Sequence, residues 1–351
     1  MRMAWFVSSV VSSYWNGAAT YYRGLGRALA GRGHELTFFE PDAYDRQAHR
    51  DISDPDWARV VVYDPERWAE ALENARGADV VVKASGVGVR DEELEAGVLE
   101  LGSDAIYWDV DAPATLARVE ADPDDPLRAL VPRYELVLTY GGGAPVVERY
   151  RALGARDCVP VYNALDPATH HPVPPDPRFV CDVAFLGHRL PDREERVEEF
   201  LLRAAELAPE RSFLLGGAGW DERPLPPNVR RIGHVSTSEH NAFNATPLAV
   251  LNVNRASMAE NGWSPPTRIF EAAGAGACVI TDAWAGIEQF LEPGDEVLVA
   301  RDGREVSELL SELEPGRARR IGDAARARVL ATHTYMDRAA QVEALLTGAP
   351  A

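Results

Sequence analysis

The chain has 351 residues, of which 46% are hydrophobic and 26% charged, a composition typical of folded globular proteins. This length exceeds what one hydrophobic core usually organises, so we expect two domains. The formal net charge of −19 repels a phosphodiester backbone, so nucleic acid is not an expected partner. A local group of arginines would still bind a small anion.

The cysteines give no sign of a disulfide framework or a zinc site. The three of them, Cys158, Cys181 and Cys278, are far apart and form no Cys-x-x-Cys pair, which fits a reducing cytoplasm. The first apolar run, residues 3–7, ends well before the length of a signal peptide or a membrane span. We therefore expect a cytoplasmic protein with no integral membrane segment and no bound metal.

The first half of the chain alternates short apolar runs with helical patterns. A strand over residues 3–7, a helix over 20–32 and a strand over 34–39 form one strand–helix–strand unit. Further strands are predicted over 80–83, 105–108 and 136–139, with a helix over 65–76. This alternation predicts a mostly parallel sheet, in an N-terminal Rossmann-like domain over residues 1–165.

A proline-rich segment separates the two halves of the chain. Residues 166–177 include five prolines, which exclude both a helix and a central strand. After it the alternation resumes, with strands predicted over 180–186, 212–215, 248–253 and 277–281, and helices over 193–207 and 266–274. These elements predict a second doubly wound, Rossmann-like α/β domain over 166–330.

The last helical pattern extends beyond this second domain. It runs over residues 318–346, with a break near 332–334. The helix and tail over 331–351 are therefore expected to cross back onto the N-terminal domain.

The segment 262–282 carries the most informative pattern, which reads as loop, helix, glycine turn and strand. Ser264 is a good helix cap, and a proline suits the first turn, so free N–H groups at the helix start attract an anion. Arg268 adds a bidentate partner for phosphate. Thr267, Arg268 and Glu271 share one helix face, and Glu271 is placed to accept hydrogen bonds from ribose. The simpler interpretation is a capped helix with an Arg268–Glu271 surface pair.

A second candidate binding loop follows the first strand of the C-terminal domain, where ligands of such sheets bind. Gly187 permits close backbone approach, and Arg189 and Arg193 would neutralise a diphosphate leaving group. The alternative is that His188 is a solvated loop histidine and Arg193 pairs with glutamates of its own helix. Both interpretations stay open from the residues alone.

Asp109 and Asp111 lie two residues apart at the end of a predicted strand, and hence on one face if the strand continues. Three interpretations are open. The pair provides a general base for an acceptor hydroxyl, or it binds a divalent metal in a metal-dependent transferase, or it forms an Asx-type turn before Pro113.

Two further loops carry weaker signals. Residues 12–17 are rich in groups that hydrogen-bond sugars, and Trp15 would stack on a pyranose ring. An ordinary turn at Asn16-Gly17 accounts for the same residues. Gly141-Gly-Gly143 exposes backbone N–H groups after a strand. The chain has no Gly-x-Gly-x-x-Gly between a strand and a helix and no Walker-type Gly-Lys-Ser/Thr, which argues against a dinucleotide dehydrogenase.

At these residues the sequence resembles the CgeB-like (spore-maturation-type) glycosyltransferases, relatives of the group-1 glycosyltransferase family with the GT-B fold. The likeness covers nearly the whole chain and is strongest over residues 264–276. It is also carried by Trp108-Asp-Val-Asp-Ala-Pro and Leu251-Asn-Val-Asn-Arg, and by residues 16–25, 32–35, 292–296 and 331–335.

The resemblance implies two facing Rossmann-like domains. A nucleotide-diphospho-sugar would bind the C-terminal one, an acceptor the N-terminal one, and a sugar would pass to an acceptor hydroxyl in the cleft between them, without a further cofactor. In the wider group a Glu-x7-Glu motif spans this region, and its second glutamate, which usually contacts the ribose, matches Glu271. Its first falls at Trp263, where no carboxylate exists. This departure keeps a second function open, that of a non-catalytic nucleotide-sugar or glycan-binding protein.

Overall fold

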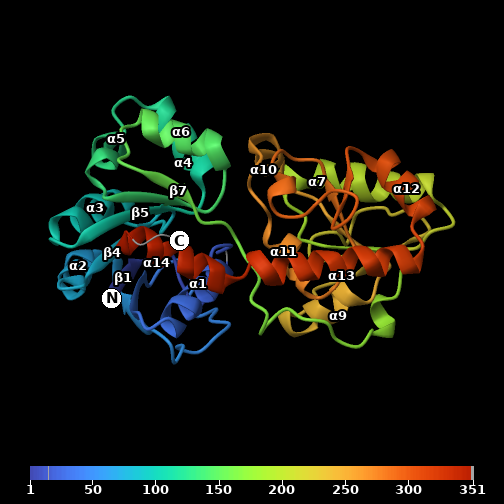
Figure 1. Ribbon diagram of the computed structural model, residues 1–351, viewed down its shortest axis with the longest axis horizontal. Coiled ribbons are helices and arrows are strands. Elements are labelled where there is room, and N and C mark those ends of the chain that lie inside the picture. The colour runs from blue at the N-terminus through green and yellow to red at the C-terminus, as the bar shows by residue number, and fades with distance from the viewer. Residues whose placement is uncertain (15, 349–351) are drawn as a thin grey trace. The chain divides into compact units, whose positions relative to one another are not determined.

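The computed structural model describes residues 1–14 and 16–348. They divide into two compact units (Figure 1). Unit 1 is formed by Met1–Asn163 together with the C-terminal helix α14 (Tyr335–Thr347), and unit 2 by Ala164–Thr334. Each unit is built on one parallel sheet with helices on its faces, as expected for two Rossmann-like domains.

Unit 1 contains a seven-stranded sheet in the order β3-β2-β1-β4-β5-β6-β7, with every neighbouring pair parallel. Its strands are β1 (Arg2–Phe6), β2 (Glu35–Pro41), β3 (Arg59–Tyr63), β4 (Val80–Ala84), β5 (Asp104–Asp109), β6 (Leu136–Thr139) and β7 (Cys158–Pro160). Its helices are α1 (Ala19–Gly31), α2 (Trp68–Ala75), α3 (Asp91–Gly97), α4 (Ala112–Ala121), α5 (Pro126–Leu130) and α6 (Gly143–Ala152). The strand order changes direction between β1 and β4.

Unit 2 contains a six-stranded parallel sheet in the order β10-β9-β8-β11-β12-β13. Its strands are β8 (Val183–Leu186), β9 (Phe213–Gly216), β10 (Val229–Ile232), β11 (Ala249–Asn252), β12 (Val279–Asp282) and β13 (Leu298–Ala300). Its helices are α7 (Pro191–Val197), continued by a π-helical turn over Glu198–Arg203 and by α8 (Ala204–Leu207), then α9 (His240–Ala245), α10 (Ala256–Asn261), α11 (Thr267–Gly274), α12 (Gly303–Glu312) and α13 (Pro315–Thr332). Here the order changes direction between β8 and β11.

The central strands are mostly apolar because helices cover both faces of each sheet. All five residues of β4 and all four of β11 are buried. In unit 2 the middle of α13 packs closely on the turn after α11. A Cβ added to Gly322 of α13 would lie 2.2 Å from the carbonyl oxygen of Gly276, so only glycine allows this approach. The packing fixes the C-terminal end of α11, whose other end belongs to the candidate site.

The C-terminal helix crosses back to unit 1, as the sequence predicts. Figure 1 shows α14 beside α1. The Tyr335 ring lies over Gly24, where an added Cβ would be 2.2 Å from a ring carbon, and the Tyr335 hydroxyl donates to Asn163 Oδ1 at 3.2 Å. Further along, Arg32 of unit 1 pairs with Glu343 of α14. Across residues 1–14 and 16–348, no helix is long and apolar enough to cross a membrane.

Candidate functional site

The loop after β8 lies at the carboxyl edge of the second sheet, beside the change in strand direction, where ligands of doubly wound sheets bind. Gly187 N donates to Gly216 O at 3.0 Å, and Gly187 O accepts from Trp220 Nε1 at 2.8 Å. The neighbouring Gly217 has φ +114°, and an added Cβ would lie 2.3 Å from Gly187 O. The two loops after β8 and β9 are therefore fixed against each other.

Three arginines surround this loop. Arg268 donates from Nη1 to the Leu186 carbonyl oxygen. Arg193 places Nη1 3.0 Å from the position that a Cβ of Gly187 would occupy. Arg189, an exposed residue of the loop itself, forms an ion pair with Glu194 at 2.5 Å. Of the predicted donor-binding residues, the structure thus brings Gly187, Arg189, Arg193 and Arg268 together.

Arg268 is held in a low-dielectric environment. Its guanidinium carbon lies 5.8 Å from the centre of the Phe185 ring, a cation–π contact. The pKa of Arg268 is lowered to about 10, mainly by burial; attraction to Glu271 opposes this shift, and repulsion from Arg193 adds to it. Arg268 keeps its charge at neutral pH. The result is a fixed, partly desolvated cation at the edge of the sheet.

The start of α11 differs from the prediction. Ser264 was expected to cap the helix, but α11 begins at Thr267 with Pro266 in the cap position and no side-chain cap bond. The reason lies in the proline pair: Pro265 precedes a proline and is therefore pushed away from helical geometry, so the helix cannot begin at Pro265. Pro266 is itself extended (φ −69°, ψ 150°). Ser264 is instead a buried loop residue. Arg268 lies in the first turn, as predicted.

Trp263 has an unusual backbone. Its φ of +43° is rare for a residue with a large side chain, and its N–H donates to Ala285 O at 2.6 Å. The indole lies against Gly286, where an added Cβ would be 2.3 Å from a ring carbon. The position at which the wider group has a carboxylate is therefore occupied by an aromatic ring packed on a glycine.

Glu271 faces the proline-rich linker. Its Oε1 lies 3.7 Å from His170 Nε2, with side chains 18% and 11% exposed. His240 of α9 joins this group, and the three ligand atoms lie within 4.8 Å of one another. Since Arg268 turns toward Leu186 and Glu271 toward His170, the simple Arg268–Glu271 surface pair is not what the described residues form. Sequence reasoning named neither histidine, because no motif marks them.

A buried polar network at the ends of β11 and β12 was also missed. Asp282 is fully buried; its carboxylate accepts from Asn254 N at 3.1 Å and from Arg196 at 2.6 Å. Arg196 also donates to Asn254 O at 3.0 Å. Burial raises the pKa of Asp282, and the bonds from Asn254 and Arg196 oppose this rise. The available signal was the Asn-x-Asn that follows an apolar run, in residues 251–255.

In unit 1, Asp109 and Asp111 have different environments. Asp109 ends β5 and is fully buried. Its carboxylate accepts from Ser85 Oγ at 2.7 Å, from Thr115 Oγ1 at 3.0 Å, from Asp111 N at 3.0 Å and from the Tyr150 hydroxyl. Burial raises the pKa of Asp109, and these bonds oppose the rise. The bond from Asp111 N is the Asx-type turn considered above.

Asp111 is exposed and occupies the cap position of α4. The strand ends at Asp109, so the two carboxylates do not share a strand face. The glycines after β6 serve the next helix. Gly142 has φ +93° at the cap of α6, and an added Cβ would lie 2.1 Å from a methyl group of Val146.

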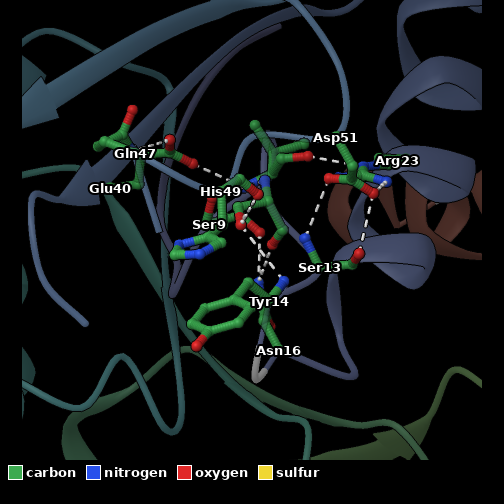
Figure 2. A network of polar contacts seen from close by, with 11 residues as sticks. Ser9, Ser13, Tyr14, Asn16, Arg23, Glu40, Gln47, His49 and Asp51 are labelled. Atoms are coloured by element: carbon green, nitrogen blue, oxygen red, sulfur yellow. Dashed lines mark hydrogen bonds and ion pairs between the residues drawn. The ribbon is translucent and has the colours of Figure 1, made fainter. Parts of the chain in front are cut away.

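The loop after β1 is held by a polar network (Figure 2). Arg23 forms two bonds to the Asp51 carboxylate, at 2.9 and 2.6 Å, and the same carboxylate accepts from Ser13 N at 3.1 Å and Ser13 Oγ at 2.9 Å. Asn16 Nδ2 donates to Ser9 O at 2.8 Å. This loop lies at the change in strand direction of unit 1 and is rigidly supported.

One exposed aromatic pair projects from this loop. The Tyr14 ring, 39% exposed, stacks on His49 with centroids 4.0 Å apart (Figure 2). A flat ring of this kind suits contact with a sugar face. Trp15, for which the sequence predicted such stacking, lies outside the described residues.

Comparison with known proteins adds independent findings. Residues 193–344 match the protein-family model described as "Glycosyl transferase-like". Sucrose-phosphate synthase from Thermosynechococcus elongatus matches with a TM-score of 0.71 at 15% identity, over 99% of both chains. Anabaena HepE in complex with UDP matches with a TM-score of 0.71 at 15% identity, over 99% of this chain and 100% of that one. AviGT4, a glycosyltransferase of avilamycin A biosynthesis, matches with a TM-score of 0.62 at 18% identity, over 99% and 98%. No curated protein matches the chain by sequence.

The two sheets and these matches define the fold: the chain has a GT-B-like fold of two Rossmann-like domains, and residues 193–344 are similar to the family described as "Glycosyl transferase-like". The matched segment begins in α7 and ends in α14. That segment contains Arg193, Ser264, Thr267, Arg268 and Glu271.

Proposed function

We propose that the protein transfers a glycosyl group, specifically a hexosyl group, from a nucleotide-diphospho-sugar to an acceptor hydroxyl. The observation that carries this proposal is the gathering of Arg189, Arg193 and Arg268 around the Gly187 loop. Although the chain has a net charge of −19, these three positively charged side chains lie together at the sheet edge where ligands of this fold bind. The motifs in residues 108–113 and 251–255 favour the CgeB-like branch.

The donor would bind unit 2 through its diphosphate and ribose. Arg268 and Arg193 supply charge-assisted hydrogen bonds to phosphate oxygens, and the uncapped start of α11 at Thr267 supplies backbone N–H groups. Glu271 is the acceptor for ribose hydroxyls. The Anabaena HepE structures, which contain UDP and glucose or UDP-glucose, support this assignment, because that protein shares the fold over the whole chain.

The chemistry requires a leaving group that tolerates negative charge. The bond between the anomeric carbon and the diphosphate oxygen breaks, the acceptor oxygen bonds to that carbon, and the acceptor proton goes to a base. The diphosphate leaves with the electron pair of the broken bond. The arginines offset this charge, and a preorganised cation costs no reorganisation during the reaction.

Asp111 is the better candidate for the base if the reaction inverts. It is exposed, whereas the Asp109 carboxylate is buried and already accepts four hydrogen bonds. An acceptor in unit 1 would lie near the loop after β1, where Tyr14 presents a ring. Asp109 acts in this proposal as a positioning residue.

Calorimetric titration of UDP-, GDP- and dTDP-sugars tests the donor site. Arg268→Ala and Glu271→Gln should weaken binding by about 10- to 100-fold, the equivalent of one or two lost hydrogen bonds to a charged group. Arg203→Ala, which removes an exposed arginine paired with Glu206 in the same unit, is the matched control. Unchanged affinity in both site variants, with the melting temperature preserved, would overturn the assignment.

Trp263, in place of a carboxylate, favours the rival function of a non-catalytic binding protein. Nucleotide release separates the two. A transferase frees the nucleoside diphosphate in the presence of an acceptor or, more slowly, by hydrolysis of the donor. A binding protein raises its own melting temperature with the donor and releases no product.

A further inference from the structure

His170, His240 and Glu271 come from three separate segments of unit 2 and converge on one point. His170 belongs to the proline-rich linker, His240 begins α9 and Glu271 lies in α11. Each presents one ligand atom, and these atoms all lie within 4.8 Å of one another. Among the residues that the structure describes, this is the one group of three or more histidine, cysteine or carboxylate side chains close enough to hold a metal ion.

The surrounding contacts hold the group in place. Asn241, next to His240, donates from Nδ2 to Thr169 O at 2.9 Å and accepts from His171 N at 3.3 Å. These two bonds join α9 to the linker on both sides of His170. The Thr169 hydroxyl lies 2.9 Å from His170 Nδ1, which orients the ring so that Nε2 faces Glu271. Such outer hydrogen bonds are typical of histidines that bind metals.

We propose that His170, His240 and Glu271 bind a divalent first-row transition-metal ion of the Zn²⁺ type. Two imidazole nitrogens and one carboxylate oxygen suit such an ion, whereas Mg²⁺ and Ca²⁺ prefer oxygen ligands alone. Tetrahedral zinc with bonds of 2.0–2.1 Å separates its ligand atoms by about 3.3 Å. The 3.7 Å between His170 Nε2 and Glu271 Oε1 is within a few tenths of an ångström of that value.

The neighbouring charges limit how tightly the ion binds. Arg268 lies close enough to repel a positive charge at His240, while Glu271 attracts it. One carboxylate therefore has to offset both the ion and a nearby guanidinium. We therefore expect the ion to bind weakly and reversibly.

The ion would compete with the sugar donor. Glu271 is the residue assigned to the donor ribose, and this second step rests on the proposed function. A carboxylate that ligates a metal no longer offers the same lone pairs to ribose hydroxyls. Binding of metal and donor is then mutually antagonistic, and by linkage each weakens the other by the same factor.

The first experiment measures metal binding without nucleotide, using the full chain after treatment with a chelator. Co²⁺ absorption in the visible range and Zn²⁺ competition against a chromophoric chelator report the site. We expect one equivalent bound, and an affinity at least about tenfold weaker in His170→Ala, His240→Ala and Glu271→Gln. His171→Ala, which removes the exposed neighbour of His170, should bind like the wild type. No binding by the wild type, or equal loss in His171→Ala, would overturn the proposal.

The second experiment measures donor affinity with and without Zn²⁺. Because a diphosphate binds Zn²⁺ in solution, His240→Ala is the decisive control: it keeps Glu271 but lacks a metal ligand. Zn²⁺ should weaken donor binding more in the wild type than in His240→Ala, where only the binding of Zn²⁺ to the free donor acts. An equal effect in both proteins would refute the competition. If no donor binds at all, the proposed function fails while the metal titration still decides the metal site.

Discussion

Replacing Asp109 separates a structural role from a chemical one. Its carboxylate is fully buried and accepts hydrogen bonds from Ser85, Thr115, Tyr150 and the backbone of Asp111. Asp109→Ala leaves three buried hydroxyls without this acceptor, and each unsatisfied group costs about 1–3 kcal/mol. Removal of a buried carboxylate recovers part of that cost. We expect a loss of about 2–4 kcal/mol in the free energy of unfolding.

Urea unfolding followed by circular dichroism measures this loss as a lower midpoint with an unchanged slope. Asp109→Asn keeps one acceptor oxygen and should lose less than Asp109→Ala. Tyr150→Phe, which removes a single donor to Asp109, should cost about 1 kcal/mol. Asp111→Asn, at an exposed position, should change stability by less than about 0.5 kcal/mol while it abolishes transfer. An Asp109→Asn protein with the wild-type urea midpoint and no turnover would show that Asp109 takes part in the chemistry.

Two further predictions concern stability. Burial raises the pKa of Glu95 to about 7, so the folded protein binds this proton more tightly than the unfolded chain, and the stability contribution falls as pH rises from about 4.5 to 7. Glu95→Gln should therefore raise the free energy of unfolding at pH 8 by up to about 3 kcal/mol, with no gain near pH 4. Urea titrations at the two pH values measure this difference. An equal gain at both would show that it does not come from the ionisation of buried Glu95. Gly322→Ala should lower the melting temperature through its clash with Gly276 O, at a cost of about 1–3 kcal/mol. The control is Gly316→Ala in the same helix, where only the tip of Arg320 lies within 4 Å; it should be neutral or stabilising. Equal effects of the two substitutions would rule out the close contact as the cause.

The sequence predicted the central strands of both sheets and missed the edges. The four strands without a prediction are β3, β7, β10 and β13, which are the outermost strands of the two sheets. Central strands are buried on both faces and read as continuous apolar runs. Edge strands are partly exposed: β10 carries Arg230 and Arg231, and β7 and β13 have only three residues each. Apolar periodicity therefore underestimates the width of a sheet.

The candidate site divides in the same way between local and long-range information. The helix start near Arg268 and the glycine loop at Gly187 are local patterns, and the sequence showed both. The meeting of His170 and His240 with Glu271 depends on how the linker packs against α9 and α11. No spacing along the chain encodes that contact. The cap at Ser264 was wrong because the restriction that Pro266 imposes on Pro265 outweighed a favourable cap residue.

The two carboxylates of the Asp-x-Asp motif at residues 109–111 have different roles in the structure. The first carboxylate accepts the backbone N–H of the second residue and so fixes the turn that carries Asp111 to the start of α4. Tyr150, Ser85 and Thr115 hold that first carboxylate from α6, from the end of β4 and from α4. The exposed carboxylate is thus positioned by a buried one, which is itself positioned by three neighbouring segments of unit 1. Two carboxylates that look equivalent in the sequence therefore differ in the structure, since one is buried and hydrogen-bonded and the other is exposed; on the proposed function, only the exposed one is accessible to an acceptor.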